Sequence, residues 1–386
     1  MPMAQVVVTE ARAVTALGDL DATWRALLAG RSGIAPVTRF DPTGCVSSLA
    51  ACVPGLEHGA TKGRSLLLAL IDRLLNGMSA MPAIPNDAPL FAATTKAGID
   101  ALESASRGGE IRADDARPDL LADEAARRLG LTGRRETVSG ACASATMALA
   151  RAAVLISHGS ATAALMVCAD LVSEFAFTGF SALRALSPAP CRPFDAKRDG
   201  LTLGEGAALL LLMSEERART ENRPILARLE GWGMANDATH ITAPARDGCG
   251  LIATVNRALA MAKARPDDVA AICAHGTGTV YNDAMELTAF RAVFDGRKVP
   301  LHGVKGALGH AMGASGGIEA ALCCRMLADR MLPPTIGLCE PDLAARGMVS
   351  EKPAPLPPGL LLSTNSGFGG LNAALLFASA RDGGRA

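Results

Sequence analysis

A cysteine within a run of small residues is the first candidate for chemistry in this chain. Cys142 lies in Thr137-Val-Ser-Gly-Ala-Cys-Ala-Ser-Ala-Thr146, where a strand is expected to end and a helix to begin. The unpaired N–H groups at a helix N-terminus stabilise a thiolate and can bind a developing oxyanion. Taken alone, the segment equally fits a small buried cysteine in a tight turn. It predicts a nucleophile only if other reactive groups accompany it.

Two histidines follow predicted strands in the second part of the chain. His275 begins His-Gly-Thr277-Gly-Thr279 at the carboxyl end of a strand, where open α/β sheets bind their ligands. The two hydroxyls suit hydrogen bonds to an extended polar arm. His310, in Leu-Gly-His-Ala-Met-Gly, precedes a helix rich in Ala and Gly. Considered without Cys142, the His275 segment also fits a turn in which the histidine has ordinary hydrogen-bond partners. The His310 segment also fits a glycine-rich helix that serves only tight packing.

Charged and aromatic residues near these segments indicate how the site is supported. Lys305 and Glu319 are expected to form a buried ion pair that fixes the loop carrying His310. The turn Gly367-Phe368-Gly369-Gly370 suggests a movable gate, with the N–H of Phe368 completing an oxyanion hole. An ordinary hairpin turn with a core phenylalanine is the simpler interpretation of that turn by itself.

One thiol with two histidines also fits a Cys-His hydrolase or a metal site. However, the histidines are not spaced as HxxxH or HExxH, and no cluster of carboxylates accompanies them. The sequence therefore predicts no bound metal.

The elements that must position these residues alternate between strands and helices. Expected strands are Gln5–Thr9, Pro89–Thr94, a short one before Ser139, Ala163–Cys168, Ala207–Met213, Ile225–Gly231, Val269–Ala274, Leu360–Ser363 and Ala373–Phe377. Expected helices are Asp21–Ala29, Lys62–Met78, Leu120–Leu129, Cys142–Ser157, Leu251–Ala264, Ala284–Val293 and Gly317–Asp329. This alternation predicts an α/β layered fold. Because the pattern starts again after residue 220, we expect a duplicated fold with halves 1–220 and 221–386.

Composition limits the class of protein and its surroundings. The chain of 386 residues is 49% hydrophobic and has a formal net charge of +0, so no global field would attract nucleic acid or an anionic membrane. The ten cysteines include no CxxC pair, which favours a reducing cytoplasm. Residues 1–14 are typical of a first strand rather than a signal peptide. The uncharged stretch 152–169 is interrupted by His158-Gly159-Ser160, so it is not expected to span a membrane.

Together, these segments resemble the β-ketoacyl-[acyl-carrier-protein] synthases of the elongating type, the condensing enzymes of fatty-acid and polyketide synthesis. The similarity includes Cys191-Arg-Pro-Phe-Asp-Ala-Lys-Arg-Asp-Gly-Leu-Thr-Leu-Gly-Glu-Gly206 and covers nearly the whole chain. It implies a thiolase-like fold, a duplicated five-layered αβαβα arrangement with two pseudo-symmetric halves. Residues 179–206 further resemble ketosynthases of aryl-polyene clusters.

The resemblance implies a reaction and a role for each residue. Cys142 would take an acyl chain from acyl-[acyl-carrier-protein] (acyl-ACP), and condensation with malonyl-ACP would then give 3-oxoacyl-ACP with loss of CO2. His275 and His310 would polarise the malonyl thioester carbonyl, and Lys305 would position His310. No bound metal or organic cofactor is needed, because the substrates are carried on the phosphopantetheine of the carrier protein.

Other expectations concern the supporting residues and the partners. Thr277 and Thr279 would hold the phosphopantetheine arm, Phe368 would gate the pocket, and Glu319 and Asp283 would support the structure. The expected partners are acyl carrier protein and either a second copy or a related ketosynthase or chain-length factor.

Three departures from the family pattern affect these expectations. Ser366 stands where relatives usually have a second Phe, so the gate is expected to differ. The segment 96–141 is short and charged, so the sequence does not define the preferred acyl-chain length or the dimer partner. Leu201-Thr202 replaces a common Phe-Val pair, with local repacking expected.

Two alternatives remain open from the sequence. A thiolase shares the fold but normally supplies a second cysteine in a Cys-x-Gly turn, and the corresponding Gly367-Phe-Gly-Gly turn has no thiol. A non-catalytic chain-length partner subunit usually lacks the nucleophile, whereas Cys142 and both histidines are present here.

Overall fold

The computed structural model describes residues 3–57, 64–76, 84–109 and 113–380. Its strands are β1 (Val6–Thr15), β2 (Gly18–Asp19), β3 (Ala35–Pro36), β4 (Leu49–Ala51), β5 (Leu90–Ala93), β6 (Arg135–Val138), β7 (Ala163–Asp170), β8 (Leu203–Gly204), β9 (Gly206–Ser214), β10 (Ala227–Asn236), β11 (Val269–Cys273), β12 (Leu301–His302), β13 (Met331–Leu332), β14 (Ala354–Pro355), β15 (Leu360–Gly367) and β16 (Leu371–Ser379). Its α-helices are α1 (Leu20–Leu28), α2 (Leu66–Leu75), α3 (Ile99–Ser106), α4 (Leu120–Leu129), α5 (Ser144–Ser157), α6 (Glu174–Ala182), α7 (Glu215–Thr220), α8 (Cys249–Met261), α9 (Val280–Val293), α10 (Lys305–Leu308) and α11 (Ser315–Asp329).

The main sheet consists of two units with the same topology. One has the strand order β6-β5-β7-β9-β1 and the other β12-β11-β15-β16-β10. When the strands of each unit are numbered in chain order, the first lies at the inner edge, and the fifth, fourth, second and third follow it outward. The second strand is parallel to the third and fourth, while the remaining pairs are antiparallel. The units join where Val6–Val8 of β1 pairs with Ala227–Leu229 of β10.

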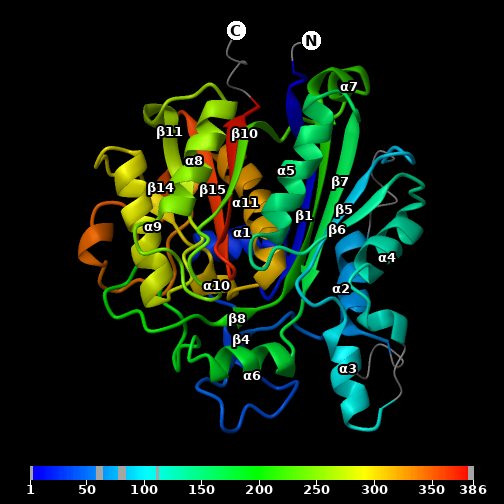
Figure 1. Ribbon diagram of the computed structural model, residues 1–386, viewed down its shortest axis with the longest axis vertical. Helices are drawn as coiled ribbons and strands as arrows, with labels where there is room; N and C mark the ends of the chain where they lie inside the picture. The colour runs from blue at the N-terminus through cyan, green and yellow to red at the C-terminus, as the bar shows by residue number, and fades with distance from the viewer. Residues whose placement is uncertain (1–2, 58–63, 77–83, 110–112, 381–386) are drawn as a thin grey trace.

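Buried side chains divide the molecule into five layers. On one outer face, α2 and α4 pack against β5, β7 and β9. On the other, α8 and α9 pack against β11, β15 and β16. Alternate side chains of both units point inward, where they enclose α5 and α11. Figure 1 shows these two helices between the two sets of strands. The expected duplicated αβαβα architecture is therefore confirmed.

The helices α5 and α11 occupy equivalent positions in the two units, because each follows the third strand and precedes the fourth. Their close packing depends on glycine. A Cβ at Gly316 of α11 would lie 2.0 Å from Oγ1 of Thr146 in α5. As a result, the N-terminus of α5 and the N-terminus of α11 meet in the middle of the molecule.

Most expected elements are present, with shifted ends. β1 and β10 extend beyond the expected Gln5–Thr9 and Ile225–Gly231 because their polar residues remain paired within the sheet. The helix expected at Cys142 begins at Ser144, which leaves the cysteine in the preceding turn. The ends of the expected helix Lys62–Met78 lie outside the described residues, as do residues 110–112 of the charged segment.

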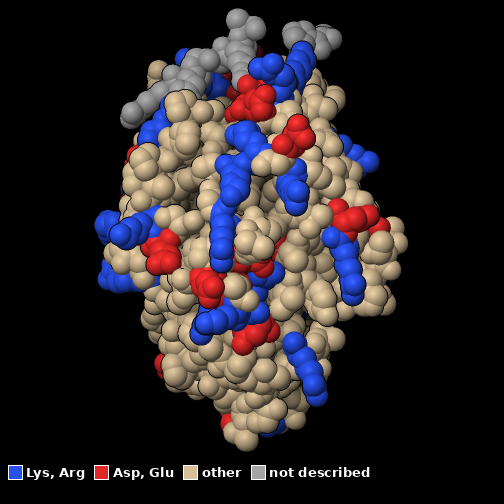
Figure 2. Space-filling view, turned by 90° about the vertical axis from the view of Figure 1, so that its left-hand side faces the viewer, with Lys and Arg blue, Asp and Glu red and all other residues tan. Residues whose placement is uncertain are grey.

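Charged side chains of both signs are interspersed on the face shown in Figure 2, where several Lys and Arg residues line up between acidic ones. Across the described part of the chain, no helix is long and apolar enough to cross a membrane.

Candidate active site

Cys142 lies in a strained turn between β6 and α5. Ala141 has a φ of 49°, a left-handed conformation that is unfavourable for a residue with a side chain. The turn is held by Ser144, whose Oγ accepts from the N–H of Gly140 at 2.9 Å and donates to the carbonyl of Ala141 at 2.6 Å. This geometry directs the thiol from the helix N-terminus into the centre of the molecule.

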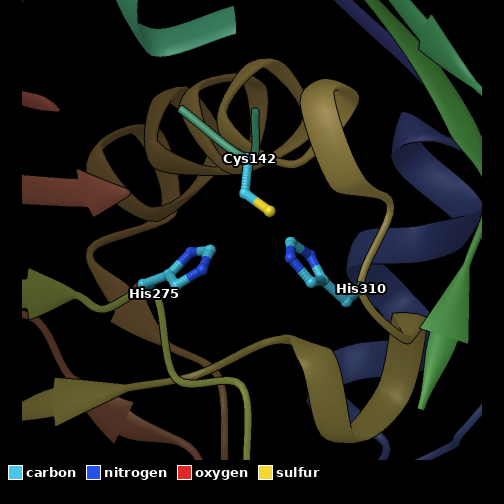
Figure 3. A group of neighbouring side chains, drawn as sticks. All are labelled: Cys142, His275 and His310. Atoms are coloured by element: carbon cyan, nitrogen blue, oxygen red, sulfur yellow. The ribbon is translucent and has the colours of Figure 1, made fainter. Parts of the chain in front are cut away.

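The two histidines come from the second unit and converge on this thiol. His275 follows β11 and His310 follows α10. Their ring centroids are 5.1 Å apart, with planes inclined by 84°. One donor atom from each histidine and the sulfur of Cys142 all lie within 4.8 Å of one another. Figure 3 shows the sulfur pointing toward the space between the two rings. The structure thus brings together the three side chains singled out in the sequence.

A buried network fixes the proton on His275. Nδ2 of Asn365 lies 3.2 Å from Nδ1 of His275 and donates to Oε2 of Glu319 at 2.7 Å. Because the carboxylate of Glu319 only accepts, the amide atom that faces it is Nδ2, and the amide oxygen accepts from Oγ1 of Thr146. Because an amide nitrogen only donates, Nδ1 of His275 accepts and Nε2 carries the proton.

Lys305 and Glu319 form the expected ion pair. Nζ of Lys305 lies 2.5 Å from Oε1 of Glu319, and both side chains are buried. Nζ also donates to the carbonyl oxygen of His275. Its direct contact is therefore with the loop of His275, whereas it acts on His310 through its charge.

Ser315, the first residue of α11, contacts the other imidazole. Its Oγ lies 3.0 Å from Nδ1 of His310, and both residues are buried. Since Nδ1 is occupied in both histidines, the nitrogen that faces the thiol is Nε2 in each case.

Glu286 is a supporting residue that the sequence analysis missed. Its carboxylate accepts from the N–H groups of His275 and Gly276, both at 2.7 Å, and from the side chain of Asn282 at 2.9 Å. Burial and the neighbouring Asp283 raise the pKa of Glu286 to about 8. The sequence feature that could have identified Glu286 is its position on the helix that follows His275, three residues after Asp283.

The hydroxyls of Thr277 and Thr279 lie beside this support. Their Oγ1 atoms are 2.9 Å apart, and Thr279 caps α9 by accepting from the N–H of Asn282. Asp283 is fully buried and accepts from the N–H groups of Phe194 and Gly278. Asp283 therefore connects the histidine loop to the loop that precedes β8.

The β15–β16 hairpin brings Phe368 next to the thiol. The N–H of Phe368 hydrogen-bonds the sulfur of Cys142, which favours the thiolate. A Cβ at Gly367 would lie 2.9 Å from the amide nitrogen of Cys142, so this approach requires glycine. The ring of Phe368 packs on Phe180 of α6, with centroids 5.7 Å apart.

Ser366 is tied into the hairpin rather than pointing freely into the pocket. Its Oγ donates to Oδ1 of Asn372 at 2.6 Å, and Nδ2 of Asn372 donates to Asp237 at 2.7 Å. The hairpin is also attached through the N–H of Gly369 to the carbonyl of Ile241. The polar replacement noted in the sequence thus links the gate to the loop after β10.

A cavity of about 300 Å³ leads from the surface to these residues. Its inner wall is formed by the catalytic candidates, and its outer part by residues of α6, α9 and the loop after β10. The lining residues include Cys142, His275, His310, Thr277, Thr279 and Phe368.

Burial dominates the electrostatics of the site. It raises the pKa of Cys142 to about 11, although the charges of Lys305 and Lys96 and the N–H of Phe368 oppose the shift. At rest, burial therefore works against the thiolate form that a helix N-terminus favours. Burial, together with Lys305, also lowers the pKa of His275 and His310 well below the usual range. Both imidazoles are neutral at pH 7.

Cys142, His275 and His310 are the one group in the described residues with three donor atoms placed closely enough for a metal ion. An imidazole–thiolate set suits zinc. An ion there would occupy the space between the three side chains that lines the cavity.

Comparisons with known proteins agree with this geometry. The model of the β-ketoacyl synthase N-terminal domain matches residues 91–218, and that of the β-ketoacyl synthase C-terminal domain matches residues 226–339. The 3-oxoacyl-[acyl-carrier-protein] synthase 2 of Synechocystis is 32% identical over 97% of each chain.

Solved structures are also similar. The ishigamide ketosynthase/chain length factor has a TM-score of 0.89 and 29% identity, over 98% of this chain and 99% of that chain. A ketosynthase in complex with its chain length factor from Xenorhabdus doucetiae has a TM-score of 0.87 and 27% identity, over 98% of each chain.

The fold, the Cys-His-His arrangement and these matches define a thiolase-like condensing enzyme. The chain belongs to the β-ketoacyl synthase family. The predicted acyltransferase function, 3-oxoacyl-ACP synthesis in fatty-acid or polyketide biosynthesis, is confirmed at this level.

Proposed function

We propose that Cys142 is the acyl-accepting nucleophile and that His275 and His310 serve both half-reactions. The observation that supports this most strongly is the convergence of the sulfur and two imidazole nitrogens within 4.8 Å, at the inner end of a cavity. Lys305 and Glu319 hold the His275 loop, and the N–H groups of Cys142 and Phe368 form the oxyanion hole.

Acyl transfer begins with removal of the thiol proton, since Cys142 is protonated at rest. His275 carries its proton on Nε2, so Nε2 of His310 is the acceptor. The sulfur attacks the acyl thioester carbon, the C–S bond to the carrier breaks, and His310 returns the proton to the leaving sulfur. The protein ends with an acyl thioester on Cys142.

Condensation uses the imidazoles as donors. The Nε2–H groups of His275 and His310 hydrogen-bond the malonyl thioester oxygen and stabilise the enolate formed as the bond to CO2 breaks. The enolate carbon attacks the acyl thioester of Cys142, the C–S bond breaks, and the released thiolate takes up a proton from solution. The product is 3-oxoacyl-ACP.

The partner of this site is acyl carrier protein, with its phosphopantetheine arm held by Thr277 and Thr279 inside the cavity and Phe368 acting as the gate. A second copy or a related ketosynthase or chain-length factor binds the chain as a dimer. No metal or organic cofactor takes part, and the ten free thiols suit a reducing cytoplasm. Residues 1–220 and 221–386 form the two domains. Within the family, the chain is assigned to the ketosynthases of aryl-polyene synthesis.

The test is mass spectrometry of the purified protein incubated with a panel of acyl-ACPs and then with malonyl-ACP. Wild type should gain one acyl group on Cys142, and Cys142→Ala none. Cys339→Ala, a change at an exposed cysteine, serves as the matched control. His310→Ala should give neither step at the wild-type rate, because His310 acts first as base and then as donor.

Three other outcomes would contradict the proposal. Acylation of Cys142→Ala at the wild-type rate would identify another nucleophile. Turnover of acetyl-CoA without a malonyl donor would indicate a thiolase. Binding to a homologous synthase without any labelling of Cys142 would indicate a non-catalytic partner subunit.

A further inference from the structure

The two imidazoles of the site have different partners on Nδ1. His275 faces the amide nitrogen of Asn365, which only donates. His310 faces the hydroxyl of Ser315 at 3.0 Å. A hydroxyl donates and accepts, so it can pair with either tautomer of a neutral imidazole. The structure therefore fixes one tautomer of His275 but leaves two open to His310.

We propose that Ser315 is a positioning residue that allows His310 to serve as base in acyl transfer and as hydrogen-bond donor in condensation. This inference rests on the proposed function. In the first step Nδ1–H donates to Oγ of Ser315, and the bare Nε2 takes the proton from the thiol. In the second step the Ser315 hydroxyl donates to Nδ1, and Nε2–H points to the thioester oxygen.

The position of Ser315 supports this assignment. It is the first residue of α11, next to the Gly316 that contacts Thr146, so the helix packing sets the place of the hydroxyl. Ser315 is 4% exposed and His310 is 2% exposed, so their contact is shielded from bulk water. Among the described residues, His310 is the one hydrogen-bond partner of this hydroxyl.

The charges around His310 keep both forms neutral. Burial lowers the pKa of His310, and the charges of Lys305 and Lys96 lower it further. The two acids nearby are engaged elsewhere: Glu319 pairs with Lys305, and Asp170 accepts from Gly313 and lies 4.0 Å from Lys96. His275 and the Cys142 thiol are the remaining titratable neighbours, and both are uncharged at pH 7. The two tautomers exchange through the imidazolium. Nε2 gains a proton from water in the cavity that His310 lines, and Nδ1 passes its proton to Oγ of Ser315, whose own hydroxyl proton is released to water.

The experiment measures single-turnover self-acylation and malonyl-ACP decarboxylation separately. Ser315→Ala should slow both steps by about tenfold, the effect of one lost hydrogen bond. Ser315→Thr keeps the hydroxyl and should stay close to wild type. Ser214→Ala, which removes the hydroxyl that caps α7 away from the site, is the matched control and should leave both rates unchanged.

A spectroscopic measurement excludes a merely structural role. In protein labelled with ¹⁵N-histidine, the ring nitrogens of His310 should have shifts intermediate between the two tautomers, and Ser315→Ala should move them toward one tautomer. Unchanged shifts and rates in Ser315→Ala would overturn the inference. If that variant does not fold, Ser315→Cys, with its weaker hydrogen bond, must give intermediate rates, and wild-type rates would overturn the inference. A wild type that is not acylated would instead contradict the proposed function.

Discussion

Nδ2 of Asn365 lies 3.2 Å from Nδ1 of His275 and also donates to Glu319, so a single amide orients the imidazole and joins it to the buried ion pair. This relationship determines which nitrogen of His275 carries the proton. It predicts that the identity of residue 365 controls condensation.

Asn365→Asp should therefore reduce malonyl-ACP decarboxylation by about 100-fold, because a carboxylate accepts from Nδ1 and removes the proton from Nε2. Self-acylation should be retained, since it depends on His310. Quantifying released CO2 and acylated protein separately checks this. Equal loss of both activities would show that Asn365 acts only through stability.

The thiol of Cys142 should react slowly with alkylating agents at neutral pH. Burial raises its pKa to about 11, so the thiolate fraction and the alkylation rate should rise about tenfold per pH unit between pH 7 and pH 10. Peptide mass spectrometry after short iodoacetamide pulses measures this rate, with exposed Cys339 as the accessible reference. A plateau near pH 7 would mean that the resting thiol is already ionised.

Lys305→Met should shift the pH dependence of decarboxylation. Lys305 lowers the pKa of both His275 and His310, so its removal raises these pKa values. Because the imidazoles act in the neutral form, the acid limb of the rate profile should move to higher pH. A profile measured from pH 5 to pH 9 tests this, and an unmoved acid limb would exclude an electrostatic role for Lys305.

Gly316→Ala should destabilise the fold by about 2 kcal/mol, because a new Cβ would overlap Oγ1 of Thr146 and disturb Asn365. Gly179→Ala is the matched control, since Gly179 also lies in a helix but has no heavy atom within 4 Å of the added Cβ. Urea unfolding of the two variants measures the difference. Equal stability would show that α5 and α11 separate without cost.

The sequence predicted which side chains meet at the candidate site better than it predicted their environment. Cys142, His275 and His310 stand out because each lies in a distinctive run of small residues, and the structure brings them together. The charge state of Cys142 is not accessible from the sequence in the same way. A local pattern shows the helix N-terminus, whereas the desolvation that raises the pKa arises from tertiary packing.

Supporting residues were missed where their partners are distant in the chain. Asn365 contacts a histidine 90 positions away, and Thr364 contacts Glu286 across 78 positions. No spacing rule reveals such pairs in a single sequence. Lys305 and Glu319 are only 14 positions apart on consecutive helices, and this short separation made their pairing predictable. The fold class could be predicted from the sequence because the alternation of strands and helices repeats along the whole chain.

The two units of the sheet have identical topology, yet they contribute unlike groups to the candidate site: one supplies the sulfur of Cys142 and the other both imidazoles. Neither unit contains a complete set of reacting groups. The site therefore exists only while the two units stay joined, and any shift of one unit against the other would move the sulfur relative to both imidazoles.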